Sequence, residues 1–125
     1  MKVQVLVTKY DLLTGEVEML AKGQGSFHDS VLTYYELENP VIKHEITFLE
    51  DKVYLRRKAE IESEVELIRG EIGCSKVHSP YGTMELESVL HTYEKGESDY
   101  LIEYSIRSDN EVLSHQKILF ELTKD

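Results

Sequence analysis

Cysteine, tryptophan and proline are scarce in this sequence of 125 residues, which contains one cysteine, no tryptophan and two prolines. With Cys74 alone, no intramolecular disulfide can form, so an apolar core has to hold the fold, as in most cytosolic domains. No apolar run approaches the roughly 18 residues of a membrane-spanning helix. The apolar run at the start is interrupted by Gln4 and ended by Lys9, which is too short for a secretory signal. These absences predict a cytoplasmic protein without a membrane segment.

Basic residues are also in deficit, with 14 Lys and Arg against 24 Asp and Glu, which gives a formal net charge of −10. Such a charge repels phosphate backbones and anionic lipid surfaces, and this argues against a nucleic-acid-binding role. The remaining composition, 41% hydrophobic and 30% charged, is typical of a folded globular chain. At this length we expect one domain, residues 1–125, with one core.

Clusters of glycine, proline, asparagine and aspartate predict turns at regular intervals along the chain. They lie at residues 14–15, 23–25, 38–40, 50–52, 70–73, 79–82, 94–96 and 108–110. Between them, apolar and polar residues alternate, as in strands with one buried face. The clearest rows are Val3, Val5 and Val7; Ile42, Ile46 and Phe48; Met84, Leu86 and Leu90; Tyr100, Ile102, Tyr104 and Ile106; and Ile118, Phe120 and Leu122.

Many short strands without crossover helices predict an all-β fold, and closing the sheet on itself removes its exposed edges. We therefore predict a closed antiparallel β-barrel of 8–10 strands, with a β-sandwich as the alternative. Both prolines fall in turns, where their missing N–H disrupts no ladder.

Residues 52–69 fit two patterns. A helix is one interpretation, because the segment is rich in Glu, Leu, Arg and Lys and several apolar residues have helical spacing. A strand is the other, because apolar residues alternate with four glutamates, Glu60, Glu62, Glu64 and Glu66. We favour a strand with a kink or bulge near Lys58 and Ala59, and the helix stays as the alternative.

Three short motifs, in this order, resemble those of the YwiB-like bacterial family of unknown function. Tyr34 and Glu36 match a Tyr-x-Glu that ends an early strand, and Arg56 or Arg57 matches an arginine after an alternating strand. The segment from His78 to Gly82 matches a Tyr-x-Thr-Pro-aromatic-Gly-like segment through Pro80, Tyr81 and Gly82. This chain has His78 in place of tyrosine, Ser79 in place of threonine and Lys58-Ala59 in place of a glycine-containing step.

The resemblance covers residues from about Val3 to Thr123. It implies a calycin-type barrel, similar to lipocalins and fatty-acid-binding proteins, and it implies no activity.

The pair Arg56-Arg57 is the most informative basic feature in so acidic a chain. Alternation places Arg57 on the face of Val53 and Leu55, so its guanidinium is expected inside the barrel, where it has to be paired or to bind an anion. One interpretation is a counter-charge for a carboxylate or phosphate ligand, assisted by tyrosines such as Tyr34 or Tyr104. The other is an internal ion pair with Glu36. The candidate ligand-binding residues are Arg56, Arg57, Tyr34, Glu36, His78 and Tyr81.

No motif for a metal, a cofactor or catalysis is present. The five histidines and Cys74 have no HxH, CxxC or HExxH spacing, and no GxSxG motif occurs. The carboxylate pairs Glu64/Glu66 and Glu85/Glu87 are interpreted as solvated faces, because charged residues are rarely buried without partners.

Three hypotheses about function follow. The first is binding of a small amphipathic or anionic molecule inside the barrel, since a barrel of this size can hold one small ligand. The alternative is a regulatory or scaffold module that presents its acidic outer surface to a basic protein partner. An enzyme comes third, because no catalytic constellation is evident. The sequence indicates no cofactor and no particular oligomeric state.

Overall fold

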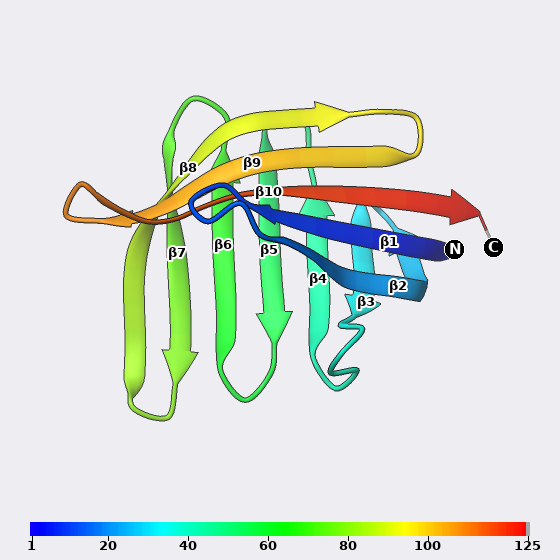
Figure 1. The fold of residues 1–125 in the computed structure, drawn as a ribbon, viewed down its shortest axis with the longest axis horizontal. Helices are drawn as coiled ribbons and strands as arrows, with labels where there is room; N and C mark the ends of the chain where they lie inside the picture. Colours follow the sequence, from blue (N-terminus) through cyan, green and yellow to red (C-terminus); the bar gives the residue numbers. More distant parts are fainter. Residues whose placement is uncertain (125) are drawn as a thin grey trace.

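The computed structural model describes residues 1–124, and this part of the chain forms ten antiparallel strands (Figure 1). Consecutive strands pair with each other and β1 pairs with β10, so the sheet closes into a barrel. The predicted closed antiparallel barrel is confirmed. The strands are β1 (Lys2–Asp11), β2 (Val17–His28), β3 (Val31–Tyr35), β4 (Lys43–Phe48), β5 (Lys52–Lys58), β6 (Glu62–Ile68), β7 (Ile72–Ser79), β8 (Gly82–Lys95), β9 (Asp99–Ser108) and β10 (Glu111–Lys124).

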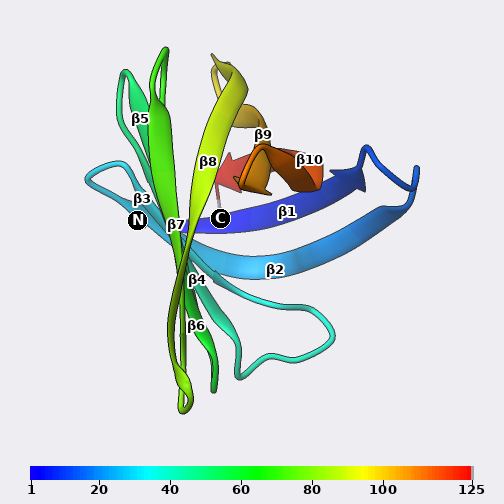
Figure 2. The same cartoon turned by 90° about the vertical axis from the view of Figure 1, so that its left-hand side faces the viewer.

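The barrel is flattened into two layers whose strands run across each other. In Figure 1, β3 to β7 run in one direction, and β1, β2, β9 and β10 run across them. The 14-residue strand β8 passes from one layer to the other, with a register shift between Leu90 and Thr92. Such a shift bends a strand and lets it turn a corner between sheets. Figure 2 shows that the β7–β8 hairpin extends past the crossing strands β1 and β2.

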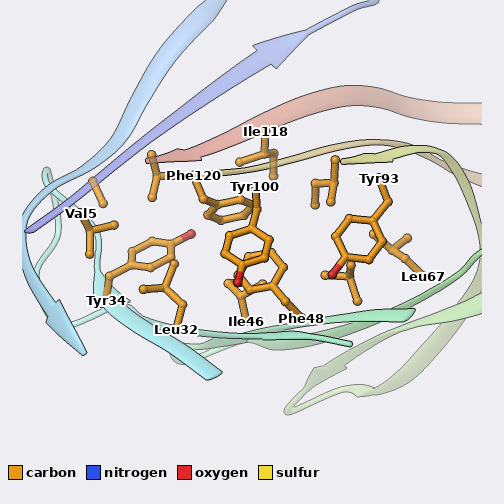
Figure 3. Packing of buried hydrophobic residues seen from close by; sticks show 14 of the residues in the cluster. Val5, Leu32, Tyr34, Ile46, Phe48, Leu67, Tyr93, Tyr100, Ile118 and Phe120 are labelled. Atoms are coloured by element: carbon orange, nitrogen blue, oxygen red, sulfur yellow. The ribbon is translucent and has the colours of Figure 1, made fainter. Parts of the chain in front are cut away.

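The core contains four of the five rows that the alternation predicted, whereas Met84 of the remaining row is 54% exposed. Val3, Val5 and Val7 of β1 are buried, and so are Tyr100, Ile102 and Tyr104 of β9. Aromatic rings fill the centre (Figure 3): the Phe48 ring stacks on Tyr100 with 3.8 Å between the ring centroids and meets Phe120 edge-on at 5.3 Å. Aromatic pairs of both kinds add to the stability that burial alone gives.

Residues 52–69 form two strands joined by a tight turn. β5 and β6 pair in antiparallel register, with Leu55 opposite Val65 on the inner face and Arg56 opposite Glu64 on the outer face. The strand interpretation is confirmed and the helix is excluded. The expected kink near Lys58 and Ala59 is instead the end of β5, because the chain reverses direction over residues 59–61.

Gly73 lets β7 approach the backbone of β6 closely. A Cβ atom at this position would lie 1.9 Å from the carbonyl oxygen of Glu66 and 2.6 Å from Ser88 Oγ. Ser88, which is fully buried in β8, donates its hydroxyl proton to the same Glu66 oxygen across 2.5 Å. A side chain at position 73 would therefore separate three strands.

Candidate functional site

A cavity of about 390 Å³ lies between the two layers of the barrel. Apolar side chains from both layers line it: Leu20, Ile46, Leu55, Val65, Ile118 and Phe120. Polar and charged side chains share the lining: Lys9, Glu18, Tyr34, Glu36, His44, Arg56, Arg57, Ser63, Tyr104 and Gln116. The site is therefore amphipathic, with an apolar wall and a concentrated set of hydrogen-bonding groups.

Four of the polar groups form one row across four neighbouring strands. Tyr34 of β3 lies opposite His44 of β4, His44 opposite Arg57 of β5, and Arg57 opposite Ser63 of β6. Directly opposed residues of a sheet point to the same face, so the whole row is directed inward. Glu36, which follows the end of β3, joins this row from the side.

Glu36 is the common acceptor of two donors. Its Oε2 atom lies 2.7 Å from His44 Nε2 and 3.0 Å from Arg57 Nε. Only 18% of the Glu36 side chain is exposed, so water screens these contacts less than it screens surface ion pairs. The internal ion pair between Arg57 and Glu36 that the sequence allowed is thus present in the structure.

The pKa values of this cluster fix its charges near neutral pH. Burial alone would raise the pKa of Glu36, but the hydrogen bonds from His44 and Arg57 outweigh burial and lower it. Burial lowers the pKa of His44, and the positive charge of Arg57 acts in the same direction against the effect of Glu36. Glu36 is therefore a carboxylate and His44 a neutral ring. Because a carboxylate only accepts, the proton of neutral His44 is assigned to Nε2.

Two buried phenols direct hydroxyl groups toward the cavity. Tyr34 is 2% exposed and its ring stacks on His44, with 4.9 Å between ring centroids. Tyr34 lines the cavity, and Figure 3 shows its hydroxyl pointing inward toward Phe120. The Tyr104 hydroxyl accepts a bond from Gln116 Nε2 and keeps its own proton to donate. Burial raises the pKa of Tyr34, and it raises the pKa of Tyr104 to about 12.

The cavity lining is more positive than the protein as a whole. Lys9 and Arg57 balance the carboxylates of Glu18 and Glu36, because the guanidinium of Arg56 pairs with Glu64 on the outer face. Lys9 Nζ lies 3.6 Å from Glu18 Oε2, so it is only loosely paired. The lining is thus neutral in a chain of net charge −10, and it repels an anion less than the chain as a whole does.

The structure brings four of the six predicted site residues together, namely Tyr34, Glu36, Arg56 and Arg57. It does not bring His78 and Tyr81 to the cavity. Tyr81 is 98% exposed, because it lies in the turn of the β7–β8 hairpin beyond the crossing strands. The His78 ring bonds Thr83 Oγ1 at 3.1 Å and lies 3.7 Å from Glu64, which is on the outer face.

Sequence reasoning missed five polar residues of the cavity: Lys9, Glu18, His44, Ser63 and Gln116. His44 is two residues from both Ile42 and Ile46, and Gln116 is two residues from Ile118. Residues two apart on a strand point to the same face, so the period of two predicts that both side chains point inward. The inward position of Leu20 could not, because it depends on a register shift between β1 and β2 next to Thr8.

Residues 1–124 contain no group of three or more His, Cys, Asp or Glu side chains placed to hold a metal ion. A pair of histidines, His91 and His115, lies on the outer face with 4.9 Å between ring centroids. In the same part of the chain, no helix is long and apolar enough to cross a membrane.

Comparison with known proteins gives one family and one solved structure. A family model described as a domain of unknown function (DUF1934) matches residues 4–119. The chain is also similar to the crystal structure of the ywiB protein from Bacillus subtilis, with 17% sequence identity and a TM-score of 0.58 over 96% of this chain and 89% of that chain. At this identity the likeness is evidence for the fold alone. No curated protein matches the chain.

Proposed function

The chain belongs to the DUF1934 family, which agrees with the resemblance to YwiB-like proteins, and we propose that its barrel binds a small amphipathic anion. One observation carries the proposal. Three donors, the hydroxyls of Tyr34 and Tyr104 and the Arg57 guanidinium, line the same cavity as an apolar wall. Donors that converge on an apolar cavity are typical of a site that orients a small ligand through its acceptor atoms.

An anionic head group fits the donors. Tyr34 and Tyr104 hold their protons at neutral pH, and Arg57 adds a charged donor beside them. Hydrogen bonds to an ionised acceptor are roughly twice as strong as neutral ones, and low local dielectric strengthens them further. A carboxylate-sized group that accepts from these residues would satisfy donors that protein atoms leave available.

An apolar body fits the rest of the cavity. Leu55 and Val65 lie in the row next to the polar row on β5 and β6, and Leu20 of β2 adds to this apolar wall. The volume of about 390 Å³ lies in the range of small-molecule sites. Shape and hydrophobicity would select the body of the ligand, and the polar row would fix its orientation. The free cysteine Cys74 supports a cytoplasmic location for this binding.

The acidic outer surface is a weaker basis for function. Glu64 lies 3.7 Å from Arg56 on β5, and Lys76 lies opposite Glu64 on β7, so this face alternates in sign. A face of mixed charge attracts a basic partner less than an unbroken acidic one. We therefore base the proposal on the interior.

The proposal is tested with the amphipathic anion 1-anilinonaphthalene-8-sulfonate, whose fluorescence rises in an apolar site, and with octanoate as the competitor. The wild-type protein is expected to bind the dye with one site, and octanoate is expected to displace it. Arg57→Gln is expected to weaken binding about tenfold, because it removes a charged hydrogen-bond donor worth roughly 1.5–3 kcal/mol. Arg69→Gln is the matched control, since Arg69 pairs with Asp51 outside the cavity.

Val65→Phe provides a second variant that keeps all charges and fills the cavity from its apolar wall. It is expected to abolish saturable dye binding while native mass spectrometry shows a folded, ligand-free protein. Equal dye affinity in wild type, Arg57→Gln and Val65→Phe, or the absence of saturable binding in the wild type, would overturn the proposal.

A further inference from the structure

Four neighbouring strands carry apolar side chains on the outer face of the barrel. β1, β10 and β9 contain continuous apolar runs, Val5-Leu6-Val7, Ile118-Leu119-Phe120 and Tyr100-Leu101-Ile102. A strand with one wet face alternates, whereas continuous apolar runs are typical of strands covered on both faces. The inner members of these runs lie in the core, so Leu6, Leu101 and Leu119 point outward.

The register places these outward residues side by side. Met19 of β2 lies opposite Thr8 of β1, Thr8 opposite Leu119 of β10, and Leu119 opposite Leu101 of β9. One neighbouring row contains Tyr10 and Lys117, and the row on the other side contains Leu6 and Glu121. We call the residues Leu6, Thr8, Tyr10, Met19, Leu101 and Leu119 the outer patch.

The outer patch is accessible in the isolated chain. Met19 is 45% exposed, and the other members are half-buried. Contiguous apolar surface of this kind marks an interaction site more often than scattered apolar residues do.

We propose that the outer patch packs against the same patch of a second copy of this chain. A two-fold axis along the row from Met19 to Leu101 superimposes that row on itself and exchanges the two flanking rows. Tyr10 then lies opposite Leu6 of the second copy, and Lys117 lies opposite Glu121 of the second copy. Each contact occurs twice, as an isologous interface requires.

Charge complementarity favours a second copy over another partner. Lys117 is already directed along this face, since its Nζ atom lies 4.8 Å from the centroid of the Tyr10 ring. The rotation brings the ammonium group of Lys117 to the carboxylate of Glu121 in the second copy. At the β9 edge the same rotation brings Glu103 near Asp99, but this contact is at the rim, where salt screens like charges. Glu103 is moreover bonded to His115 at 2.7 Å.

The interface is independent of the proposed ligand site, because the outer patch and the cavity lie on opposite faces of the same strands. Binding of the dye tests the cavity, and the oligomeric state tests the outer patch. Failure of either leaves the other intact.

Sedimentation equilibrium at about 100 μM, where an interface of standard size is populated, is the first test. The wild type is expected to have twice the 14.5 kDa of the chain, and Leu119→Glu is expected to have the mass of one chain. Val41→Glu, at a position 79% exposed in the loop before β4, is the matched control and is expected to stay dimeric.

The second test exchanges the charges of Lys117 and Glu121 and leaves the apolar residues of the outer patch unchanged. Lys117→Glu is expected to weaken the dimer about tenfold or more, since it sets like charges opposite each other twice. Adding Glu121→Lys to that variant is expected to restore the dimer. Within one chain the two residues are four positions apart on β10, about 13 Å, so the rescue requires a second copy.

Three results would overturn the proposal. One is a wild-type protein that is a monomer at the stated concentration. Another is a Leu119→Glu variant that remains folded and as dimeric as the wild type. The third is a double charge exchange that associates no better than Lys117→Glu alone.

Discussion

The guanidinium of Arg57 and the carboxylate of Glu36 are in contact although a strand separates them. Arg57 is on β5 and Glu36 follows β3, and the two side chains meet over β4 with 3.0 Å between Arg57 Nε and Glu36 Oε2. The principal cationic group of the cavity is thus already paired within the chain. An anionic ligand has to share Arg57 with Glu36 or to replace it.

Replacing Glu36 by glutamine is therefore expected to tighten binding of the anionic dye. The substitution keeps the size of the side chain and removes the charge that competes for Arg57, which is worth roughly 1 kcal/mol or about fivefold in affinity. The dye titration measures this change, and Glu64→Gln, which affects Arg56 on the outer face, is the control. Weaker binding by Glu36→Gln would mean that the carboxylate orients Arg57 for the ligand.

Two tyrosine-to-phenylalanine substitutions are expected to have opposite effects. Tyr34→Phe removes a hydroxyl that faces the cavity, so stability should change by less than about 0.5 kcal/mol while dye binding weakens severalfold. Tyr93→Phe removes the bond from the Tyr93 hydroxyl to the Leu49 carbonyl oxygen, 2.7 Å long, and should cost about 1 kcal/mol without affecting binding. Urea unfolding and the dye titration separate the two outcomes. A large loss of stability in Tyr34→Phe would contradict the assignment.

Acidification is expected to destabilise the fold through His44. Its pKa is lowered in the folded protein, chiefly by burial, so between that pKa and the ordinary value of about 6.5 the unfolded chain binds more protons. The free energy of unfolding should therefore decrease as the pH falls from about 7.5 to about 5.5. In His44→Gln the decrease should be smaller, and in His28→Asn, at an exposed surface position, it should be unchanged.

Protonation of Glu36 is also expected to lower the free energy of unfolding, at a lower pH than protonation of His44. The pKa of Glu36 is lowered by the bonds from His44 and Arg57, which outweigh burial. The stability it contributes is complete above its ordinary pKa and is lost as the pH falls through the lowered value. Urea midpoints measured across this acid range should fall less in Glu36→Gln than in the wild type. Parallel curves for the two proteins would be inconsistent with the ion pair.

The close approach at Gly73 predicts that replacing this glycine lowers the stability of the fold strongly. Gly73→Ala places a Cβ atom against the Glu66 carbonyl oxygen and should cost about 2–4 kcal/mol, because both neighbours are backbone or fully buried. Ser88→Ala, which removes only the bond to Glu66, should cost about 1 kcal/mol. Since the Ser88 hydroxyl is one of the groups that the new methyl would meet, the double variant should lose less than the sum. Chemical denaturation measures all three, and strict additivity would count against the close approach.

The antiparallel barrel and most inward rows could be predicted from the sequence, because burial of one face imposes a period of two. Val3, Val5 and Val7 and the row that begins at Tyr100 are examples. The same period placed Arg57 inside. It could not distinguish one kinked strand at Lys58 from two strands, because local alternation continues on both sides of a tight turn. The turn predicted at residues 23–25 was wrong, since these residues lie inside β2.

The composition of the cavity was only partly accessible to such reasoning. Tyr34 was found through the Tyr-x-Glu motif, and Arg57 through the alternation that places it on the face of Val53 and Leu55. His78 and Tyr81 were included through a motif that fixes a turn but carries no information on how far that turn extends beyond the second layer. Leu20 depends on a register shift, which is a property of two strands together and is absent from either sequence segment alone.

Closure of the ring has a consequence for how the chain folds. Within residues 1–124, nine of the ten strand pairings join strands that are consecutive in sequence, and only the pairing of β1 with β10 joins the two ends, with Val3 opposite Lys124. Hairpins can therefore form locally and early, whereas the seam between the ends has to wait for nearly the entire chain. Until it forms, β1 and β10 present two unpaired edges at once. We expect the slowest step of folding, and the state most prone to aggregation, to lie at this seam.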